Sequence, residues 1–184
     1  MHPNPNFFVA VVENVTFLAD PFMKLGLVPE SETAIHGAQA TGCSPISTAQ
    51  KAGLDFFRPV KLDTIAKSLA IGTPADGFYA LKVMKDTGAA AGDVTDDEIR
   101  DAIKLLAETE GIFAETAGGV TVGVAQKLIA SGKIPRNDSV VLCVTGNGLK
   151  TLDAVAGHVG KPREIKPSLR EFEALLAHEE KVNA

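Results

Sequence analysis

The sequence predicts an α/β fold of three layers, in which helices flank a parallel sheet. Two short apolar runs, at residues 7–12 and 139–145, are typical of strands that are buried on both faces. Between them lie segments with the apolar spacing of amphipathic helices. Aromatic residues make up only 5% of the chain and Trp is absent, so small aliphatic side chains must fill the core. Strands that alternate with such helices favour a parallel sheet.

The N-terminal region predicts two strands and a first helix. Residues 7–12 read FFVAVV and form the stronger strand candidate, while residues 35–38 form a weaker one. The helix should begin at Ser44-Pro45, where a capping hydroxyl precedes a proline at the first helical position. It should end near Gly53, because glycine commonly closes a helix.

The middle of the chain predicts three more helices. Residues 61–70 carry an apolar stripe at helical spacing. A further helix opens at Pro74 and is closed by Gly88. The third follows Thr95, which forms a capping box with Glu98 ahead of an apolar face.

The C-terminal region predicts a strand between two helices. Residues 111–115 form a brief strand or an extended link, and the helix behind them ends at Gly132. Residues 139–145 read SVVLCVT and are the clearest strand of the chain. A second capping box begins at Ser168 and opens a terminal helix that ends at about Glu180.

Composition and charge exclude several classes of protein. The net charge is −5, so no overall positive field would gather nucleic acid or an anionic membrane surface. No apolar stretch reaches membrane-spanning length, and the N-terminus lacks the pattern of a secretory signal. We therefore expect a cytoplasmic protein without a nucleic-acid or membrane partner. Cys43 and Cys143 have no CxxC partner, and Cys143, which lies in an apolar run, is expected to be a reduced, buried thiol. The four histidines show no metal or triad spacing.

The clearest strand ends in a short polar loop, Thr145-Gly146-Asn147-Gly148. Ligands of open parallel α/β sheets bind beyond the carboxyl ends of the strands. The threonine hydroxyl can donate and accept a hydrogen bond, and the glycines let a planar ligand approach the backbone. The alternative is a glycine turn that only closes the strand, since short glycine patterns are common. The loop matches neither the dinucleotide pattern GxGxxG nor the phosphate loop GxxxxGK[ST].

A second candidate site lies at residues 110–119. Glu110 and Glu115 bracket a short apolar run, and Ala117-Gly118-Gly119 open the next helix. Small residues at this position could pack closely against a cofactor, or the helix amides could face an anion. The alternative is a solvated acidic turn that leads into a close-packed helix.

Four segments together resemble the threonine synthases. Residues 36–45 read HGAQATGCSP and are similar to the family's GAQAxGCSP segment, and residues 64–72 read TIAKSLAIG and are similar to TIAxSIAIG. Residues 110–119 resemble the EGIF…AGG segment, and residues 145–150 resemble the TGNGLK signature. The order and spacing of the segments also match, over roughly residues 25–153.

The resemblance implies a fold-type-II pyridoxal-phosphate enzyme, of which this chain would be the C-terminal part, with a tryptophan synthase beta-like fold. The family converts O-phosphohomoserine and water to threonine and phosphate. By similarity, the Thr145 hydroxyl would hydrogen-bond the pyridine nitrogen of the cofactor, which moderates the electron sink of the ring. Gly146 and Asn147 would lie against the ring, and Glu110 would lie close to the cofactor pocket.

The sequence also departs from the family. Members hold the cofactor as a Schiff base on a lysine of a Ser-Phe-Lys-Asp type motif, and none of the 13 lysines here lies in such a motif. The glycine-rich loop for the cofactor phosphate should lie just upstream of Leu25, but residues 7–24 contain no glycine. Thr73 replaces the asparagine of the family's IGNPA segment.

These departures predict that the chain has two regions and is a truncated form of a threonine synthase-like enzyme. Residues 1–24 are expected to be an unrelated or altered segment, and residues 25–184 the C-terminal part of a threonine synthase-like domain. The catalytic power of such an enzyme comes from the cofactor and from the lysine that moves protons. We therefore expect no catalytic residue in this chain, no threonine synthase activity of the chain alone, and only weak affinity for pyridoxal phosphate.

Two other functions stay open. The chain could be a non-catalytic binding module derived from the same fold, because apolar surface that an intact enzyme buries would be uncovered and would favour self-association. It could also be a nucleotide-binding α/β domain that uses residues 145–148. A small phosphorylated amino acid is the ligand expected from the family instead.

Overall fold

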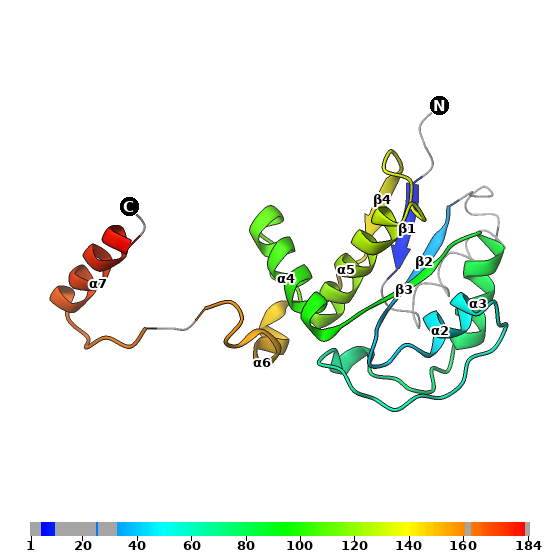
Figure 1. Cartoon of the computed structure of the whole chain (residues 1–184), viewed down its shortest axis with the longest axis horizontal. Helices are drawn as coiled ribbons and strands as arrows, with labels where there is room; N and C mark the ends of the chain where they lie inside the picture. The colour runs from blue at the N-terminus through cyan, green and yellow to red at the C-terminus, as the bar shows by residue number, and fades with distance from the viewer. Residues whose placement is uncertain (1–4, 10–24, 26–32, 161–162, 183–184) are drawn as a thin grey trace.

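The computed structural model describes residues 5–9, 25, 33–160 and 163–182 (Figure 1). Within them, four parallel strands form one sheet in the order β3-β2-β1-β4. The strands are β1 (Pro5–Val9), β2 (Ile35–Ala40), β3 (Ala91–Val94) and β4 (Ser139–Leu142). The predicted parallel sheet is therefore confirmed.

The order of the strands changes direction at β1. From β1 the chain moves outward to β2 and β3, and it then returns to place β4 on the opposite side of β1. In open α/β sheets, ligands bind beyond the carboxyl ends of the two strands at which the order reverses. Here those two strands are β1 and β4, so the segment that follows β4 lies at the expected ligand position.

One face of the sheet is covered by α5 (Thr116–Ala130), and α4 (Asp96–Glu110) packs against α5. Glycine at position 92 of β3 lets α5 approach closely, because a Cβ atom on Gly92 would lie 2.5 Å from Val124 Cγ1. The core on this side is aliphatic and includes Ala38, Ala40, Val94, Ile99, Ile103, Val120 and Val124.

The opposite face carries α2 (Pro45–Lys51) and α3 (Gly77–Asp86) over β2 and β3. Gly37 of β2 faces this side, since a Cβ atom there would lie 2.8 Å from Met84 Sδ. Alternate strand residues thus point to two separate cores, as the pleat of a strand requires. The second core consists of Ile46, Ala49, Ala80, Leu81, Met84, Ala89 and Ala91. The three predicted layers are therefore present.

Helix α2 begins at the predicted proline but is capped by a different residue. Gln39 Oε1 accepts hydrogen bonds from the N–H groups of Ile46 and Ser47, at 2.9 and 2.8 Å. Ser44 makes no side-chain cap, because its hydroxyl donates to the Thr41 carbonyl instead. The prediction of a Ser44 cap was wrong, and the cap comes from the end of β2.

The predicted helix over residues 61–70 was also wrong. Only the short 3-10 turn η1 (Lys67–Leu69) forms there. The Asp96 carboxylate accepts hydrogen bonds from the Thr64 hydroxyl at 2.7 Å and from the Ile65 N–H at 3.2 Å. The Asp63 N–H donates to the Gly42 carbonyl at 2.9 Å. Backbone groups of this segment are thus satisfied by tertiary partners rather than by a helical ladder.

The other predicted elements are present with shifted ends. Strand β4 ends at Leu142 rather than at Thr145, and residues 111–115 form one isolated bridge rather than a strand of the sheet. The capping box of Thr95 and Glu98 is present at α4, and Gly111 ends that helix with φ 68°. Residues 10–12 of the first predicted strand lie outside the described residues. The sequence did not predict β3, η2 (Gly148–Thr151) or α6 (Leu152–Val155).

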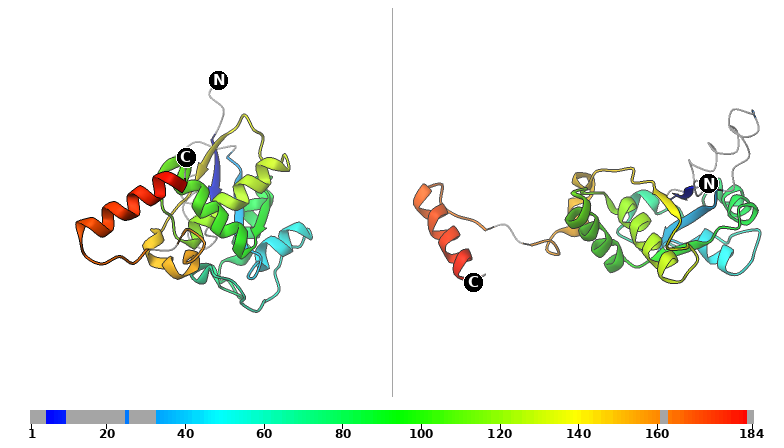
Figure 2. Two further views of the ribbon diagram at one scale, coloured as in Figure 1. Left: turned by 60° about the vertical axis from the view of Figure 1, so that its left-hand side comes forward. Right: turned by 90° about the horizontal axis from the view of Figure 1, so that it is seen from above.

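Helix α7 (Leu169–Val182) lies apart from the other helices, as Figure 1 and the right-hand view of Figure 2 show. The Ser168 hydroxyl accepts a hydrogen bond from the Glu171 N–H at 3.3 Å, so the predicted start is confirmed. In the described part of the chain, no helix has the length and apolar character needed to cross a membrane. Cys43 and Cys143 are free thiols. Cys43 is buried, whereas Cys143, for which burial was predicted, is only half-buried because it follows the exposed end of β4.

Candidate functional site

The loop after β4 packs directly on the segment that leads into α5. Ala114 and Asn147 form an antiparallel bridge. The Glu115 N–H donates to the Gly146 carbonyl at 3.0 Å, and the Gly148 N–H donates to the Phe113 carbonyl at 2.9 Å. The two segments that the sequence singled out, more than thirty residues apart, therefore form one structural unit.

Both loop glycines are required by this packing. A Cβ atom on Gly146 would lie 2.0 Å from the Glu115 carboxylate, and one on Gly148 would lie 2.6 Å from the Phe113 ring. Real Cβ atoms do not approach heavy atoms so closely, so a side chain at either position would displace the loop or the side chain of Glu115 or Phe113 that it meets. The missing side chain of Gly146 therefore makes room for Glu115.

Thr145 presents a free hydroxyl at the carboxyl end of the sheet. The residue is exposed, and its hydroxyl makes no hydrogen bond with any residue that the structure describes. Asn147 is exposed as well, but its Oδ1 accepts a hydrogen bond from the Leu149 N–H at 2.9 Å and so caps η2. The Thr145 hydroxyl and the Asn147 amide nitrogen are thus both without a partner among the described residues and could meet a ligand.

Glu110 occupies the last turn of α4 and is exposed. Within the described chain, no hydrogen bond or ion pair joins it to the loop at residues 145–148. Glu115 is the acidic residue that contacts the loop, and only 4% of its surface is exposed. The sequence contained both carboxylates but did not distinguish the buried one.

The Glu115 carboxylate is paired with Lys150, the last residue of the TGNGLK segment, to which the sequence assigned no role. Lys150 Nζ lies 2.8 Å from Glu115 Oε2, and the side chains are 63% and 6% exposed. The contact has the distance of an ion pair but not the angles of a hydrogen bond, since Oε2 has no hydrogen-bond partner among the described residues. Charge pairing at short range nevertheless offsets part of the cost of burying the carboxylate.

The first turn of α5 is tied to the same loop region. The Thr116 N–H donates to Thr151 Oγ1 at 3.3 Å. The Thr121 hydroxyl donates to the Ala117 carbonyl at 3.1 Å and reaches the Cys143 carbonyl at 3.5 Å. These contacts hold the end of β4 and the turn after it against the helix.

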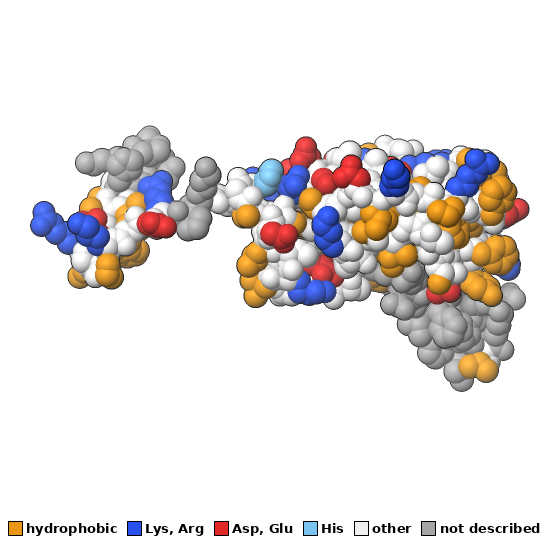
Figure 3. All heavy atoms as spheres, turned by 90° about the horizontal axis from the view of Figure 1, so that it is seen from below, with side chains coloured by type: hydrophobic (Ala, Val, Ile, Leu, Met, Phe, Trp, Pro, Cys, Tyr) orange, Lys and Arg blue, Asp and Glu red, His pale blue; other side chains and the backbone are white. Residues whose placement is uncertain are grey.

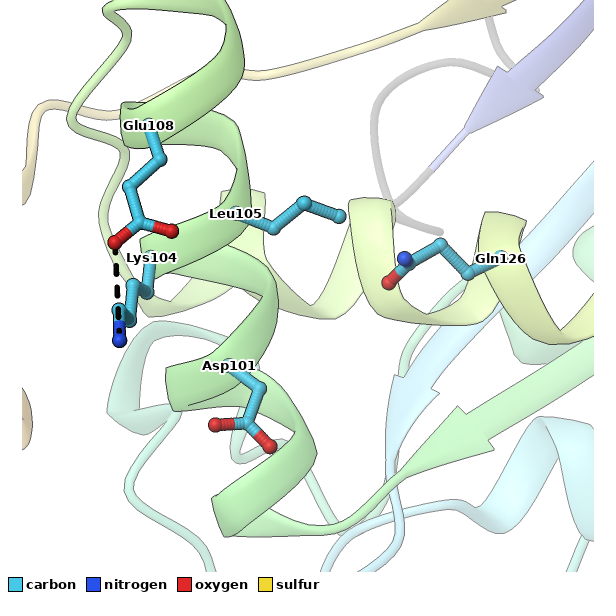
Figure 4. Close-up of a pocket in the computed structure, with 5 residues that line it drawn as sticks. All are labelled: Asp101, Lys104, Leu105, Glu108 and Gln126. Atoms are coloured by element: carbon cyan, nitrogen blue, oxygen red, sulfur yellow. Dashed lines mark ion pairs between the residues drawn. The ribbon is translucent and has the colours of Figure 1, made fainter.

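The hollow drawn in Figure 4 lies elsewhere, between the outer sides of α4 and α5. It has a volume of about 320 Å³ and is lined by Asp101, Lys104, Leu105, Glu108 and Gln126. Lys104 and Glu108 form an ion pair across 3.7 Å, with both side chains largely exposed. A shallow surface of mixed charge on two helices differs from the apolar, concave sites that usually bind small molecules.

Residues 14–146 match the protein family described as pyridoxal-phosphate dependent enzyme. The threonine synthase of Methanocaldococcus jannaschii is 36% identical over 141 residues, which cover 76% of this chain and 35% of that protein. The threonine synthase of Halalkalibacterium halodurans is 43% identical over 116 residues, which cover 63% of this chain and 32% of that protein. The chain thus spans about a third of the length of these relatives.

Solved structures share the fold at low sequence identity. Threonine deaminase isoform 2 of Solanum lycopersicum matches with a TM-score of 0.61 and 19% identity, over 86% of this chain and 45% of that one. An L-serine ammonia-lyase of Rhizomucor miehei matches with a TM-score of 0.60 and 19% identity, over 83% and 49%. Taken with the sequence match, these similarities show that the chain belongs to the pyridoxal-phosphate dependent enzyme family and carries part of its α/β fold.

Proposed function

We propose that this chain forms the ring-nitrogen side of a pyridoxal-phosphate site in an enzyme of the threonine synthase type. The observation that carries the proposal is the Thr145 hydroxyl, exposed and without a partner among the described residues, beyond the carboxyl end of β4. That position lies where the order of the strands reverses, which is where open α/β sheets bind ligands.

The residues of the loop fit one edge of this cofactor. A free hydroxyl can donate a hydrogen bond to an unprotonated pyridine nitrogen. Thr145 would hydrogen-bond that nitrogen, while Gly146 and Asn147 would border the ring. Glu115 would support the loop by packing against Gly146. When bound, pyridoxal phosphate supplies the electron sink for chemistry at the substrate's α-carbon. Glu110 stays a proposed neighbour of the pocket that no described contact joins to the loop.

Among the described residues, the lysine that lies near the loop is unsuited to anchor the cofactor covalently. Lys150 is the lysine nearest to Thr145 in sequence, and its ammonium group is paired with the buried Glu115. An amine held as a paired cation is a poor nucleophile toward an aldehyde. We therefore propose that the chain by itself binds the cofactor weakly and does not turn over substrate, and that residues 25–184 correspond to the C-terminal part of the family's domain.

The proposed reaction of the whole enzyme follows from its relatives. Both quoted relatives are named threonine synthase, and the family's reaction converts O-phosphohomoserine and water to threonine and phosphate. A small phosphorylated amino acid is accordingly the proposed substrate. This chain would contribute binding and orientation of the cofactor ring rather than a proton-moving group.

Binding of pyridoxine 5′-phosphate tests the role of Thr145. This probe keeps the ring nitrogen and the phosphate but has no aldehyde, so it cannot react with surface lysines. Thr145→Val removes the hydroxyl at nearly constant shape and should weaken binding about two- to tenfold, the usual range for one hydrogen bond. Thr109→Val, at an exposed position on α4, should change nothing. Equal binding by the wild type and Thr145→Val would contradict the proposed site.

The proposal that the chain is inactive alone has a separate test. Borohydride reduction after incubation with pyridoxal phosphate should give only scattered, substoichiometric lysine adducts. A single stoichiometric adduct would instead identify a Schiff-base lysine in this chain and would overturn the proposal.

Exposed apolar side chains beside the loop support a further proposal, that this surface is covered by protein. Ile112, Leu149 and Leu152 are 48%, 70% and 51% exposed. Figure 3 shows apolar side chains spread over one face of the main body and over α7. Uncovered apolar surface of this kind favours association, either with the remainder of an enzyme or with a second copy of the chain.

A further inference from the structure

We infer that Glu115 and Lys150 form a positioning pair that fixes the loop carrying Thr145. The catalytic meaning of this pair rests on the proposed cofactor site, but its effect on the loop does not. Neither residue is offered as a group that reacts; both act on the loop that presents Thr145.

The Glu115 carboxylate packs against the loop at Gly146. A Cβ atom on Gly146 would lie 2.0 Å from both Glu115 Cδ and Oε1, so the carboxylate fills the space in which a side chain at position 146 would stand. The backbone of Glu115 holds the same residue, because its N–H donates to the Gly146 carbonyl at 3.0 Å. Glu115 thus contacts the residue next to Thr145 through both its backbone and its side chain.

Lys150 contacts Glu115 from the opposite end of the loop to Gly146. It belongs to η2, whose first turn is capped by Asn147 Oδ1, so the chain from residue 147 to residue 150 has a defined conformation. Its ammonium group reaches back 2.8 Å to Glu115 Oε2. The loop is therefore held at Gly146 by Glu115, at Gly148 by the Phe113 carbonyl and at Lys150 by the ion pair.

The burial of one partner separates this pair from an ordinary surface ion pair. The Glu115 side chain is only 6% exposed, whereas both partners of the pair Lys104–Glu108 are more than half exposed. Exposed pairs contribute little because water competes for both charges. Removal of Lys150 would leave a buried carboxylate without its cation, and such a group moves toward water if it can. Because Gly146 rests on that carboxylate, the loop would move with it.

Amide hydrogen exchange of the full chain tests the effect on the loop. The amides of Glu115 and Gly148 donate across the loop contact and report its opening. Lys150→Met should raise their exchange rates about tenfold or more relative to amides inside α4. This is less than the loss of a fully buried ion pair would give, because water screens the exposed Lys150. Lys150→Arg keeps the cation and should restore the slow rates. Lys104→Met, which removes an exposed partner, is the matched control and should leave both amides unchanged.

A double variant distinguishes charge pairing from simple packing. Glu115→Gln with Lys150→Met removes both charges together, so exchange should return most of the way to the wild-type rates. Exchange in Lys150→Met that equals the Lys104→Met control, or that rises equally throughout α4, would overturn the inference. The inference would also be overturned if the Glu115 and Gly148 amides exchanged as fast in Lys150→Arg as in Lys150→Met.

The cofactor probe keeps this result separate from the proposed function. If the pair positions Thr145, Lys150→Met should weaken binding of pyridoxine 5′-phosphate, and adding Thr145→Val should weaken it little further. Fast exchange in Lys150→Met with a wild-type protein that does not bind the probe would contradict the cofactor site and leave the positioning pair supported. Slow exchange in Lys150→Met would contradict the pair, whatever the probe does.

Discussion

At the scale of single residues, Gly146 is a point of close contact between the loop after β4 and the segment before α5. Gly146→Ala should destabilise the protein by about 1–3 kcal/mol, the usual cost of forcing an extra methyl group into a packed site. The cause is the Glu115 carboxylate, 2.0 Å from the new Cβ atom. Urea unfolding followed by circular dichroism measures the change.

Gly123→Ala is the matched control for this substitution. Its Cβ atom would meet Val94 Cγ1 at 3.1 Å and Ala102 Cβ at 3.4 Å, which needs only a slight shift of the neighbours. Gly123 lies inside α5, where alanine is the better helix former by about 1 kcal/mol. The two effects should nearly cancel. If both variants lost the same stability, the contact with Glu115 would not be the cause.

His36 makes stability depend on pH. Burial, the larger effect, lowers the pKa of His36 below its usual value of 6.5, and the backbone of Ala90 offsets only part of that shift. Its Nδ1 accepts a hydrogen bond from the Ala90 N–H at 3.1 Å, which requires the unprotonated nitrogen. A lowered pKa in the folded state gives stability that is present above pH 6.5 and lost as the pH falls toward the folded value.

Urea midpoints at about pH 7.5 and about pH 5.5 measure this loss, because the carboxyl groups titrate mostly below that window. The wild type should be less stable at the lower pH. His36→Asn cannot titrate, and its amide oxygen can replace Nδ1 as the acceptor, so its stability should change less between the two conditions. An equal loss in both proteins would assign the pH dependence to other groups.

At the scale of elements, α4 and α7 offer two helix starts of the same type in different surroundings. Thr95 accepts a hydrogen bond from the Glu98 N–H and α4 packs on α5, whereas α7 lies apart (Figure 1). Thr95→Ala should cost about 1 kcal/mol of global stability. Ser168→Ala should only fray α7, with no change in the main unfolding midpoint. Equal shifts of the midpoint would mean that α7 unfolds together with the sheet.

The elements also show what the sequence could predict. Starts such as Thr95 and Ser168 were predictable because a cap depends on residues within one turn. Strand β3 was missed because Ala91-Gly92-Asp93-Val94 has weak strand propensity and forms beside β2 for reasons of packing. The failed helix over residues 61–70 has the same origin, since its hydrogen bonds go to Asp96.

The candidate site divides in the same way. The position of Thr145 was predictable, because a polar loop after a buried strand lies at the carboxyl edge of a parallel sheet. The partnership of Glu115 with Lys150 was not, because the two are 35 positions apart and are brought together by the Ala114–Asn147 bridge and the backbone hydrogen bonds on either side of it. Pairs of this kind become visible only once the tertiary contacts are known.

At the scale of the whole molecule, helices cover the two lateral edges of the sheet, at β3 and at β4, to different extents. Helices cover both faces of β2 and β3, as the two cores show. At the β4 end, Val140 packs against the α5 side, while Val141 and Leu142 are 39% and 37% exposed. Because the chain spans about a third of the length of its relatives, we propose that this exposed end is where the rest of a complete enzyme packs.

Helix α7 gives the chain a second exposed apolar surface, formed by Leu169, Phe172 and Leu176 at 71%, 48% and 44% exposure. Their spacing places them along one side of the helix, so two copies can bury them against each other. Sedimentation velocity over a range of concentrations should therefore detect self-association.

Phe172→Glu should weaken this self-association by placing a charge on the apolar side of α7. Ala174→Glu adds the same charge on the opposite side and should not. Because both variants carry the same net charge, equal weakening would point to general repulsion between copies, and association unaffected by either would point instead to the exposed end of the sheet.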